Sequence, residues 1–239
     1  MSTTPRFPVE GLQFLRALKR NNRREWFQAH REEYERCVRG PMTEFVLALA
    51  ADFRRIAPEM VADPKVCLYR IYRDTRFSKD KTPYKTHAAA VFPRRGLGKH
   101  AGAGLYFHVG LQEVWIGGGV YAPMPDQLLA IRQHIAARPR AFRSIVESPA
   151  FRRAFGELEG AKLSRVPAGF PKDHPAMGYI KYKQFLAGGE LQPEMATSPR
   201  FYRLIVEHFQ KALPLLRFLN QPLLRVAGRA ARQAAIDTL

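Results

Sequence analysis

The sequence predicts an α+β protein with a central, mainly antiparallel sheet flanked by N-terminal and C-terminal helices. Apolar residues recur at helical spacing through residues 1–60 and again after residue 125. Between these regions, residues 65–121 hold short apolar runs separated by glycine, proline and polar residues, as is typical of strands. No linker, repeat or low-complexity block divides the chain. We therefore expect a single domain over residues 1–239.

Three helices are expected in residues 1–60, where apolar side chains recur every three or four positions. The second of them is predicted to begin at "NNRREWF", where Asn22 is followed by Glu25 three residues later, as in a capping box. Asn22 is therefore expected to be its N-cap. The third helix carries an apolar stripe that runs from Met42 to Ile56 and faces the core.

Four segments are predicted as strands. The first, "KVCLYRIY" (65–72), is apolar on both of its alternating faces, which indicates a central strand covered on both sides. The others are "AAAVF" (88–92), "GLYFHVG" (104–110) and "EVWIGGGVY" (113–121), and the last two are close enough to form a hairpin. The "GGG" at 117–119 lacks the features of a phosphate-binding loop, so it predicts a bulge or a close backbone approach.

Helices are predicted again from Pro125. The Ser-Pro pairs at 148–149 and 198–199 are each typical of an N-cap followed by a first-turn proline. Pro214 is expected to bend or break the last helix. Residues 157–197 are rich in glycine and proline, so we expect an irregular segment there, with a candidate strand near "KQFL".

Composition narrows the classes of protein to consider. The chain carries 39 Lys and Arg against 21 Asp and Glu, a net charge of +18. The surplus is spread along the chain, which excludes a simple basic tail and favours attraction of polyanions. Most of the cations are arginine, however, and the base composition of a gene can produce that excess alone.

Several other classes are excluded or not expected. No apolar run is long enough to span a membrane, and the first residues lack the apolar core of a signal peptide. Cys37 and Cys67 have neither metal-binding nor disulfide spacing, and no serine-hydrolase or zinc-protease motif is present. We therefore expect a soluble, cytoplasmic protein with no metal, no cofactor and no membrane partner.

The segment "RIYRDTRFSKDKTPYKTH" (70–87) concentrates cations and aromatic residues directly after the first predicted strand. Arginine offers paired planar donors that suit phosphate or carboxylate, and lysine adds compact positive charge. Asp74 and Asp80 can orient these cations. The candidate ligand-binding residues of the segment are Arg70, Arg73, Arg76, Lys79, Lys81 and Lys85.

A second mixture of cations and aromatics lies at 169–185. Its blocks "GFPKDHP" and "KYKQF" supply Lys172, His174 and Lys183 as further candidate ligand-binding residues. Aromatic side chains among cations can stack on bases or sugars. The alternative is that the aromatics belong to the core and the lysines face solvent.

Candidate catalytic groups are few. In the strand 104–110, Tyr106 and His108 share the less apolar face, where Tyr106 could pack against a ligand. Asp74 or His108 is the candidate acid or base, and Tyr84 is the candidate proton donor.

The spacing Arg70-x-x-Arg73-Asp74-x-Arg76-Phe77-x-x-x-Lys81-x-x-Tyr84 matches the signature RxxRDxRFxxxKxxY at every position. By this motif the chain resembles the domain-of-unknown-function 2461 family of bacterial conserved hypothetical proteins. Segments 14–34, 117–123 and 169–185 are similar to other blocks of that family, so the resemblance covers most of the chain. It implies a stand-alone protein of about this length, brings no activity with it, and favours the Arg70–Tyr84 segment as the site.

Three functions stay open at this point. The first is a binding module for a phosphorylated ligand or nucleic acid, with an affinity that falls as salt rises. The second is an enzyme acting on a phosphorylated or otherwise anionic small substrate, in which arginines stabilise developing negative charge. The third is a structural or interaction domain whose Arg–Asp pairs only brace a loop. Anion recognition is our working hypothesis.

Overall fold

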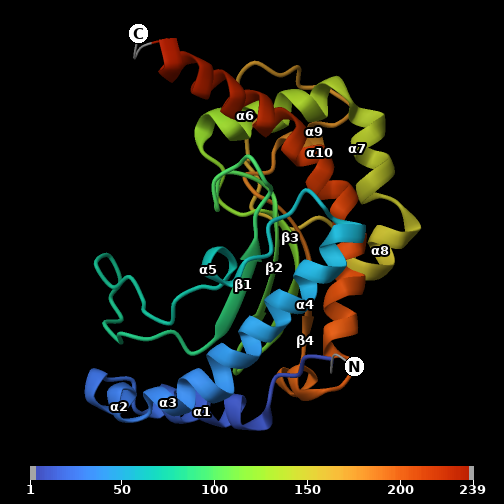
Figure 1. Cartoon of the computed structure of the whole chain (residues 1–239). Coiled ribbons are helices and arrows are strands. Elements are labelled where there is room, and N and C mark those ends of the chain that lie inside the picture. Colours follow the sequence, from blue (N-terminus) through green and yellow to red (C-terminus); the bar gives the residue numbers. More distant parts are fainter. Residues whose placement is uncertain (1–3, 237–239) are drawn as a thin grey trace. The chain divides into compact units, whose positions relative to one another are not determined.

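The computed structural model describes residues 4–236, with side chains up to residue 228. Helices lie at both ends of the chain, and a four-stranded antiparallel sheet has the order β1-β2-β3-β4 (Figure 1). The predicted α+β class is confirmed. The strands are β1 (Ala88–Phe92), β2 (Gly104–Val109), β3 (Val114–Val120) and β4 (Phe185–Leu191).

The chain divides into two compact units, each built from three separate stretches of sequence. The first unit comprises Met1–Phe92, Tyr106–Ile116 and Glu190–Glu207. The second comprises Pro93–Leu105, Gly117–Gly189 and His208–Leu239. The expectation of a single domain stays a prediction.

Helices of the first unit precede the sheet, as expected, but they are more numerous and shorter than the pattern suggested. They are α1 (Val9–Arg20), α2 (Arg24–Ala29), α3 (Arg31–Tyr34), the π-helical turn η1 (Glu35–Arg39), α4 (Gly40–Ile56) and α5 (Pro64–Cys67), with the 3-10 helix η2 (Pro193–Thr197) later in the chain. The predicted stripe of α4 is buried from Met42 to Phe53, while Ile56 at its end is half-buried. The Phe45 ring lies 5.8 Å from Phe107 and 5.4 Å from Phe201. These contacts form the core of the unit.

Asn22 is not the cap of α2, contrary to expectation. The helix begins at Arg24, its N-cap residue is Arg23, and no side chain caps it. Asn22 instead bonds to the backbone of Tyr84, a residue 62 positions away. A long-range demand for hydrogen bonds therefore outweighs the local capping pattern.

The strand predicted at 65–72 is wrong. Its first residues form the helical turn α5, because Pro64 suits a first turn and the Asp63 carboxylate accepts from the Lys65 N–H at 2.8 Å. The remaining residues form two isolated antiparallel bridges, Leu68 with Ala90 and Tyr72 with Tyr84, in place of a continuous strand. A capped Asp-Pro turn overrides the apolar alternation.

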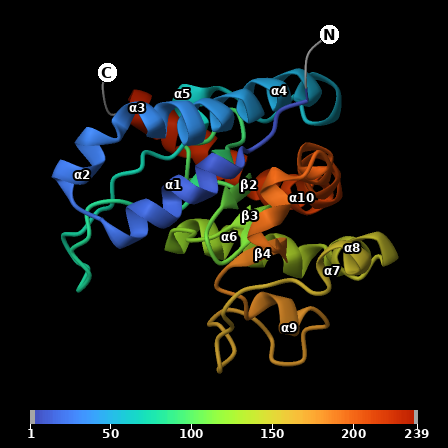
Figure 2. The same ribbon diagram turned by 90° about the horizontal axis from the view of Figure 1, so that it is seen from below.

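Residues 70–87 form a long loop that projects beside α2 (Figures 1 and 2). Both arms of the loop are paired near its base. The Arg73 N–H donates to Pro83 O and the Lys85 N–H donates to Ile71 O, each at 2.8 Å. We call residues 70–87 the basic hairpin.

Helices of the second unit follow the sheet's third strand. They are α6 (Pro125–Ala137), α7 (Pro139–Val146), α8 (Pro149–Phe155), α9 (Met177–Ile180) and the greater part of α10 (Phe201–Ile236). The start of α6 at Pro125 and the Ser148 cap of α8 are confirmed, since the Ser148 hydroxyl accepts from the Phe151 N–H at 3.1 Å. The helix does not break at Pro214, which lies inside α10.

The segment 157–197 is less irregular than expected, because it contains α9, β4 and η2. The candidate strand near "KQFL" is confirmed and extends to Leu191. In the core of the second unit, Phe142 lies 5.2 Å from Phe218 and 6.5 Å from Phe185, between ring centroids. Among the described residues, no helix has the length and apolar character required to cross a membrane.

The expected close backbone approach at 117–119 is confirmed. A Cβ at Gly118 would lie 2.7 Å from Gly104 O, and a Cβ at Gly119 would lie 2.0 Å from Phe185 O. Gly119 also has φ +145°, a conformation that side-chain-bearing residues rarely adopt. Both glycines are therefore required by the neighbouring strands.

We expect Gly119→Ala to lower the free energy of unfolding by about 3 kcal/mol or more, since it adds a backbone clash to an unfavourable φ. Urea denaturation would measure the change. The matched control is Gly178→Ala in α9, where a Cβ meets no atom within 4 Å. Equal effects of the two substitutions would contradict the packing argument.

Candidate functional site

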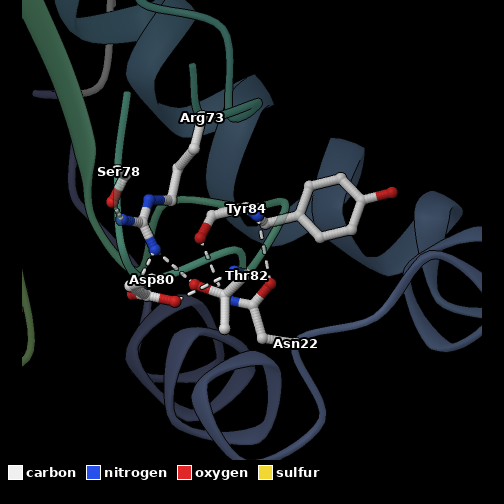
Figure 3. A network of polar contacts seen from close by, with 6 residues as sticks. All are labelled: Asn22, Arg73, Ser78, Asp80, Thr82 and Tyr84. Atoms are coloured by element: carbon white, nitrogen blue, oxygen red, sulfur yellow. Dashed lines mark hydrogen bonds and ion pairs between the residues drawn. The ribbon is translucent and has the colours of Figure 1, made fainter. Parts of the chain in front are cut away.

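Asn22 holds the basic hairpin against the N-terminal helices. Its Nδ2 donates to Tyr84 O at 2.9 Å, and its Oδ1 accepts from the Tyr84 N–H at 3.0 Å (Figure 3). The hairpin arms pair through the residues on either side of Tyr84, so the amide groups of Tyr84 itself point away from that pairing. Phe27 of α2 stacks on the Tyr84 ring with centroids 4.2 Å apart. Backbone and ring of Tyr84 are thus both fixed.

Arg73 closes the tip of the hairpin. Its Nη1 donates to the Asp80 carboxylate and to the Thr82 hydroxyl, and its Nη2 donates to the Ser78 hydroxyl at 3.4 Å (Figure 3). Asp80 also accepts from the Thr82 N–H at 2.9 Å. That backbone bond, together with Arg73, lowers the pKa of Asp80 to about 2. The carboxylate therefore stays ionised and keeps its partners over most of the pH range.

The exposed end of the hairpin has its own ion pair. Arg76 donates to both oxygens of Asp74, from Nε at 3.0 Å and from Nη2 at 2.8 Å. This paired contact lowers the pKa of Asp74 to about 2. Both groups are largely in solvent, so the pair contributes to the shape of the tip more than to stability.

The remaining cations of the hairpin are either bonded to its backbone or exposed to solvent. Lys81 donates to Thr75 O at 2.9 Å, while Lys85 donates to Arg70 O at 3.1 Å and lies 5.1 Å from the centre of the Tyr69 ring. The side chains of Lys79 and Arg70 are exposed, and within residues 4–228 neither makes a hydrogen bond or a close ion pair. Much of the predicted cation cluster therefore braces the hairpin itself.

A hollow of about 320 Å³ lies between α2 and the hairpin. Its lining residues are Arg24, Gln28, Tyr72, Arg73, Thr75, Pro83 and Tyr84. None of these residues is acidic, and most offer a hydrogen-bond donor. Burial raises the pKa of Tyr84, while the nearby Arg24 charge acts in the opposite direction. The hollow is therefore positive and rich in donors.

Of the predicted residues, only Arg73 and Tyr84 line this hollow. Arg24 and Gln28 were not predicted. Their spacing of four residues places both on one face of α2, which a sequence pattern can reveal. Nothing local indicates that the hairpin faces them, because the link runs through the distant bond from Asn22.

A second polar group lies on β2. The hydroxyl of Tyr106 is 3.2 Å from His108 Nδ1, and His108 Nε2 is 3.4 Å from a carboxylate oxygen of Glu113. Tyr106 and His108 are half-buried while their neighbours in the strand are buried, which confirms the predicted faces. His87 completes the group, with its ring 5.5 Å from His108.

Burial lowers the pKa of both His87 and His108. The pKa of His87 falls to about 4, to which the nearby His108 and Lys85 contribute less than burial does. Both imidazoles are therefore neutral near pH 7. With the proton of His108 on Nε2, facing Glu113, its Nδ1 accepts from the Tyr106 hydroxyl. A neutral imidazole so oriented has the chemistry of a general base. The catalytic roles of Asp74, Tyr84 and His108 stay predictions.

The second predicted cluster belongs to the other unit. Tyr182 and Phe185 are buried there, which favours the interpretation of these aromatics as core. Lys172 and Lys183 are exposed. His174 accepts at Nδ1 from the Ala176 N–H at 3.1 Å, and its Nε2 lies 3.2 Å from Ala136 O. Ligand binding by Lys172, His174 and Lys183 stays a prediction. Nowhere in the described part of the chain do three or more His, Cys, Asp or Glu gather as metal ligands.

We expect Asn22→Ala to lower the free energy of unfolding by about 1–3 kcal/mol, because it leaves the amide N–H and carbonyl of Tyr84 without their partners. Chemical denaturation would measure it. The adjacent Asn21 is a matched control, since its side chain bonds only locally, to Ala17 O at 3.0 Å. A loss from Asn21→Ala as large as that from Asn22→Ala would contradict a special role for the hairpin clamp.

We expect His87 to make stability fall as the pH drops from about 6.5 towards 4. Its folded-state pKa is about 4 against an ordinary 6.5, so the unfolded chain binds the proton more readily in that window and acid favours unfolding. Denaturation of wild type and His87→Gln between pH 7 and 4.5 would test this. The variant should lose less stability over the interval, and parallel curves would refute the assignment.

With the geometry of the site established, comparison with known proteins places the chain. No curated protein and no solved structure matches it. A family model described as "Conserved hypothetical protein (DUF2461)" matches residues 10–218, which include α2, the basic hairpin, the sheet and the first part of α10. The match covers well over half of the 239 residues, and the chain therefore belongs to the DUF2461 family.

Proposed function

We propose that the hollow between α2 and the basic hairpin binds a phosphate-containing anion. One observation carries the proposal: two arginines from separate elements, Arg24 and Arg73, line the same hollow, and no acidic residue does. Arginine presents planar paired donors that match the oxygens of a phosphate. The Gln28 amide and the Thr75 hydroxyl add neutral donors to the same surface.

The two arginines have different parts in this proposal. Arg73 is already held by Asp80, Thr82 and Ser78, so a ligand would find it in a fixed orientation at little entropic cost. Its charge is also partly compensated by Asp80. Arg24 is exposed and makes no ion pair among the described residues, so it supplies the uncompensated charge.

The tyrosines suggest what accompanies the phosphate. Tyr72 and Tyr84 line the hollow with their rings tilted by 46° and their centroids 5.4 Å apart, and Tyr72 is 47% exposed. A volume of about 320 Å³ is small for a ligand site, so the bound portion would be a compact group such as one phosphate with part of a sugar or base. The net charge of +18 would raise the local concentration of such anions.

The cytoplasm is the compartment we propose. Cys37 and Cys67 are buried and form no disulfide, and burial raises the pKa of the Cys37 thiol to about 11. Such thiols are unreactive and suit a reducing environment.

Isothermal titration with inorganic pyrophosphate at low salt would test the proposal. We expect Arg24→Ala to weaken binding at least about tenfold, because it removes a charge-assisted contact. The matched control is Arg23→Ala. Arg23 is the neighbour of Arg24 in the sequence, carries the same charge on an exposed side chain, and does not line the hollow. Its substitution should change the affinity by no more than about twofold.

Equal losses from the two substitutions would mean that pyrophosphate responds to overall charge and not to the hollow. The absence of binding to the wild-type protein would overturn the proposal outright. Arg73→Ala is a poor probe here, because Arg73 also closes the hairpin, so its loss would combine folding and binding effects.

A further inference from the structure

Phe77 is 96% exposed at the tip of the basic hairpin. The tip around it is held in shape, since the Ser78 N–H donates to Thr75 O at 3.3 Å and Lys81 donates to the same carbonyl. The Arg76 guanidinium lies 5.8 Å from the centre of the Phe77 ring, and Asp74 holds that guanidinium in place. An apolar ring is thus presented to water by a braced turn.

The charge around Phe77 limits what could cover it. The hairpin carries six Lys and Arg and two Asp, so its formal charge is 6 − 2 = +4. Lys79 and Arg70 keep their charges free of close ion pairs among the described residues. A partner for this tip should therefore offer a flat apolar face together with repeated negative charge.

We propose that Phe77 stacks on an unpaired base of a single-stranded nucleic acid whose phosphate occupies the hollow, an inference that rests on the proposed function. Unpaired bases expose the flat faces that aromatic side chains stack on, and the phosphates beside them supply the negative charge. Arg76 adds a cation beside the same ring.

The spacing of the two features allows one strand to meet both. Thr75 lines the hollow, and Phe77 follows it by two residues, so their Cα atoms are at most about 7.6 Å apart. A strand with a phosphate in the hollow would therefore pass near the tip, where one of its bases could stack on Phe77. Lys79 is exposed on the same tip and available to neighbouring phosphates.

Fluorescence anisotropy with a labelled 15-nucleotide oligo(dT) would test the inference. Phe77→Ala should weaken binding about tenfold, within the roughly 5- to 150-fold that one stacked base contributes. Phe77→Tyr keeps the ring face and should stay close to wild type. The slope of affinity against salt should be the same for all three proteins, because no charge is removed.

Two controls separate stacking from other effects. An abasic oligonucleotide of the same length keeps the phosphates and lacks the bases, so wild type and Phe77→Ala should bind it equally. Leu47→Ala removes another exposed apolar side chain, which is 56% exposed on α4 and does not line the hollow, and should leave oligo(dT) binding unchanged. Because Phe77 is almost fully exposed, its substitution should not unfold the protein.

The inference is overturned if Phe77→Ala binds oligo(dT) as wild type does, or if it weakens binding of the abasic strand equally. It is also overturned if Phe77 proves to be required for binding to anionic phospholipid vesicles and not for oligo(dT). If pyrophosphate binding depends on Arg24 while oligo(dT) binding does not depend on Phe77, the proposed function stands and only this inference is refuted. If pyrophosphate does not bind, the proposed function is refuted, and so is this inference, which rests on it.

Discussion

The two hydrogen bonds between Asn22 and the backbone of Tyr84 are the constraint on which the site depends. Tyr84 bridges to Tyr72, and this pairing leaves the N–H and C=O of Tyr84 facing the N-terminal helices. Residues 4–87 contain no strand that could pair with them. A single asparagine side chain supplies both a donor and an acceptor, and so replaces the missing strand locally. Because Phe27 stacks on the same tyrosine, α2 and the hairpin are held together and the hollow between them has a defined width.

Internal bracing and ligand binding are compatible in this arrangement. Arg73 bonds to three of the hairpin's own side chains, as a purely structural reading requires, yet it also lines the hollow. The bonds that brace it fix the direction of its guanidinium, and a fixed donor binds an anion with less loss of entropy than a mobile one. Asp80 offsets part of the charge of Arg73, so in the proposed site the larger electrostatic role would belong to Arg24 on α2.

The sequence was informative wherever the determinant was local. Apolar spacing identified the α4 stripe and the alternation of Tyr106 and His108, and composition pointed to the hairpin. Prediction from sequence fails where hydrogen-bonding groups compete with the local pattern of the chain. Asn22 bonds to the backbone of Tyr84, 62 residues away, and does not cap the adjacent helix α2. Asp63 caps the helical turn α5 in a segment whose apolar alternation predicts a strand. Arg24 and Gln28 were missed for the same reason, since only the tertiary contact brings the hairpin to them.

The polar group around His108 matters to the proposed enzymatic alternative, whereas the proposed anion recognition does not depend on it. Tyr69 links it to the hairpin stem, with its ring near the Lys85 ammonium and 6.3 Å from the Tyr106 ring. None of Tyr106, His108 and Glu113 lines the hollow, however. An enzyme would require a substrate long enough to reach from the hollow to His108, while a binding module requires only the hollow. Anion recognition is therefore the more economical of the two proposals, because it needs only residues that line the hollow, Arg24 among them.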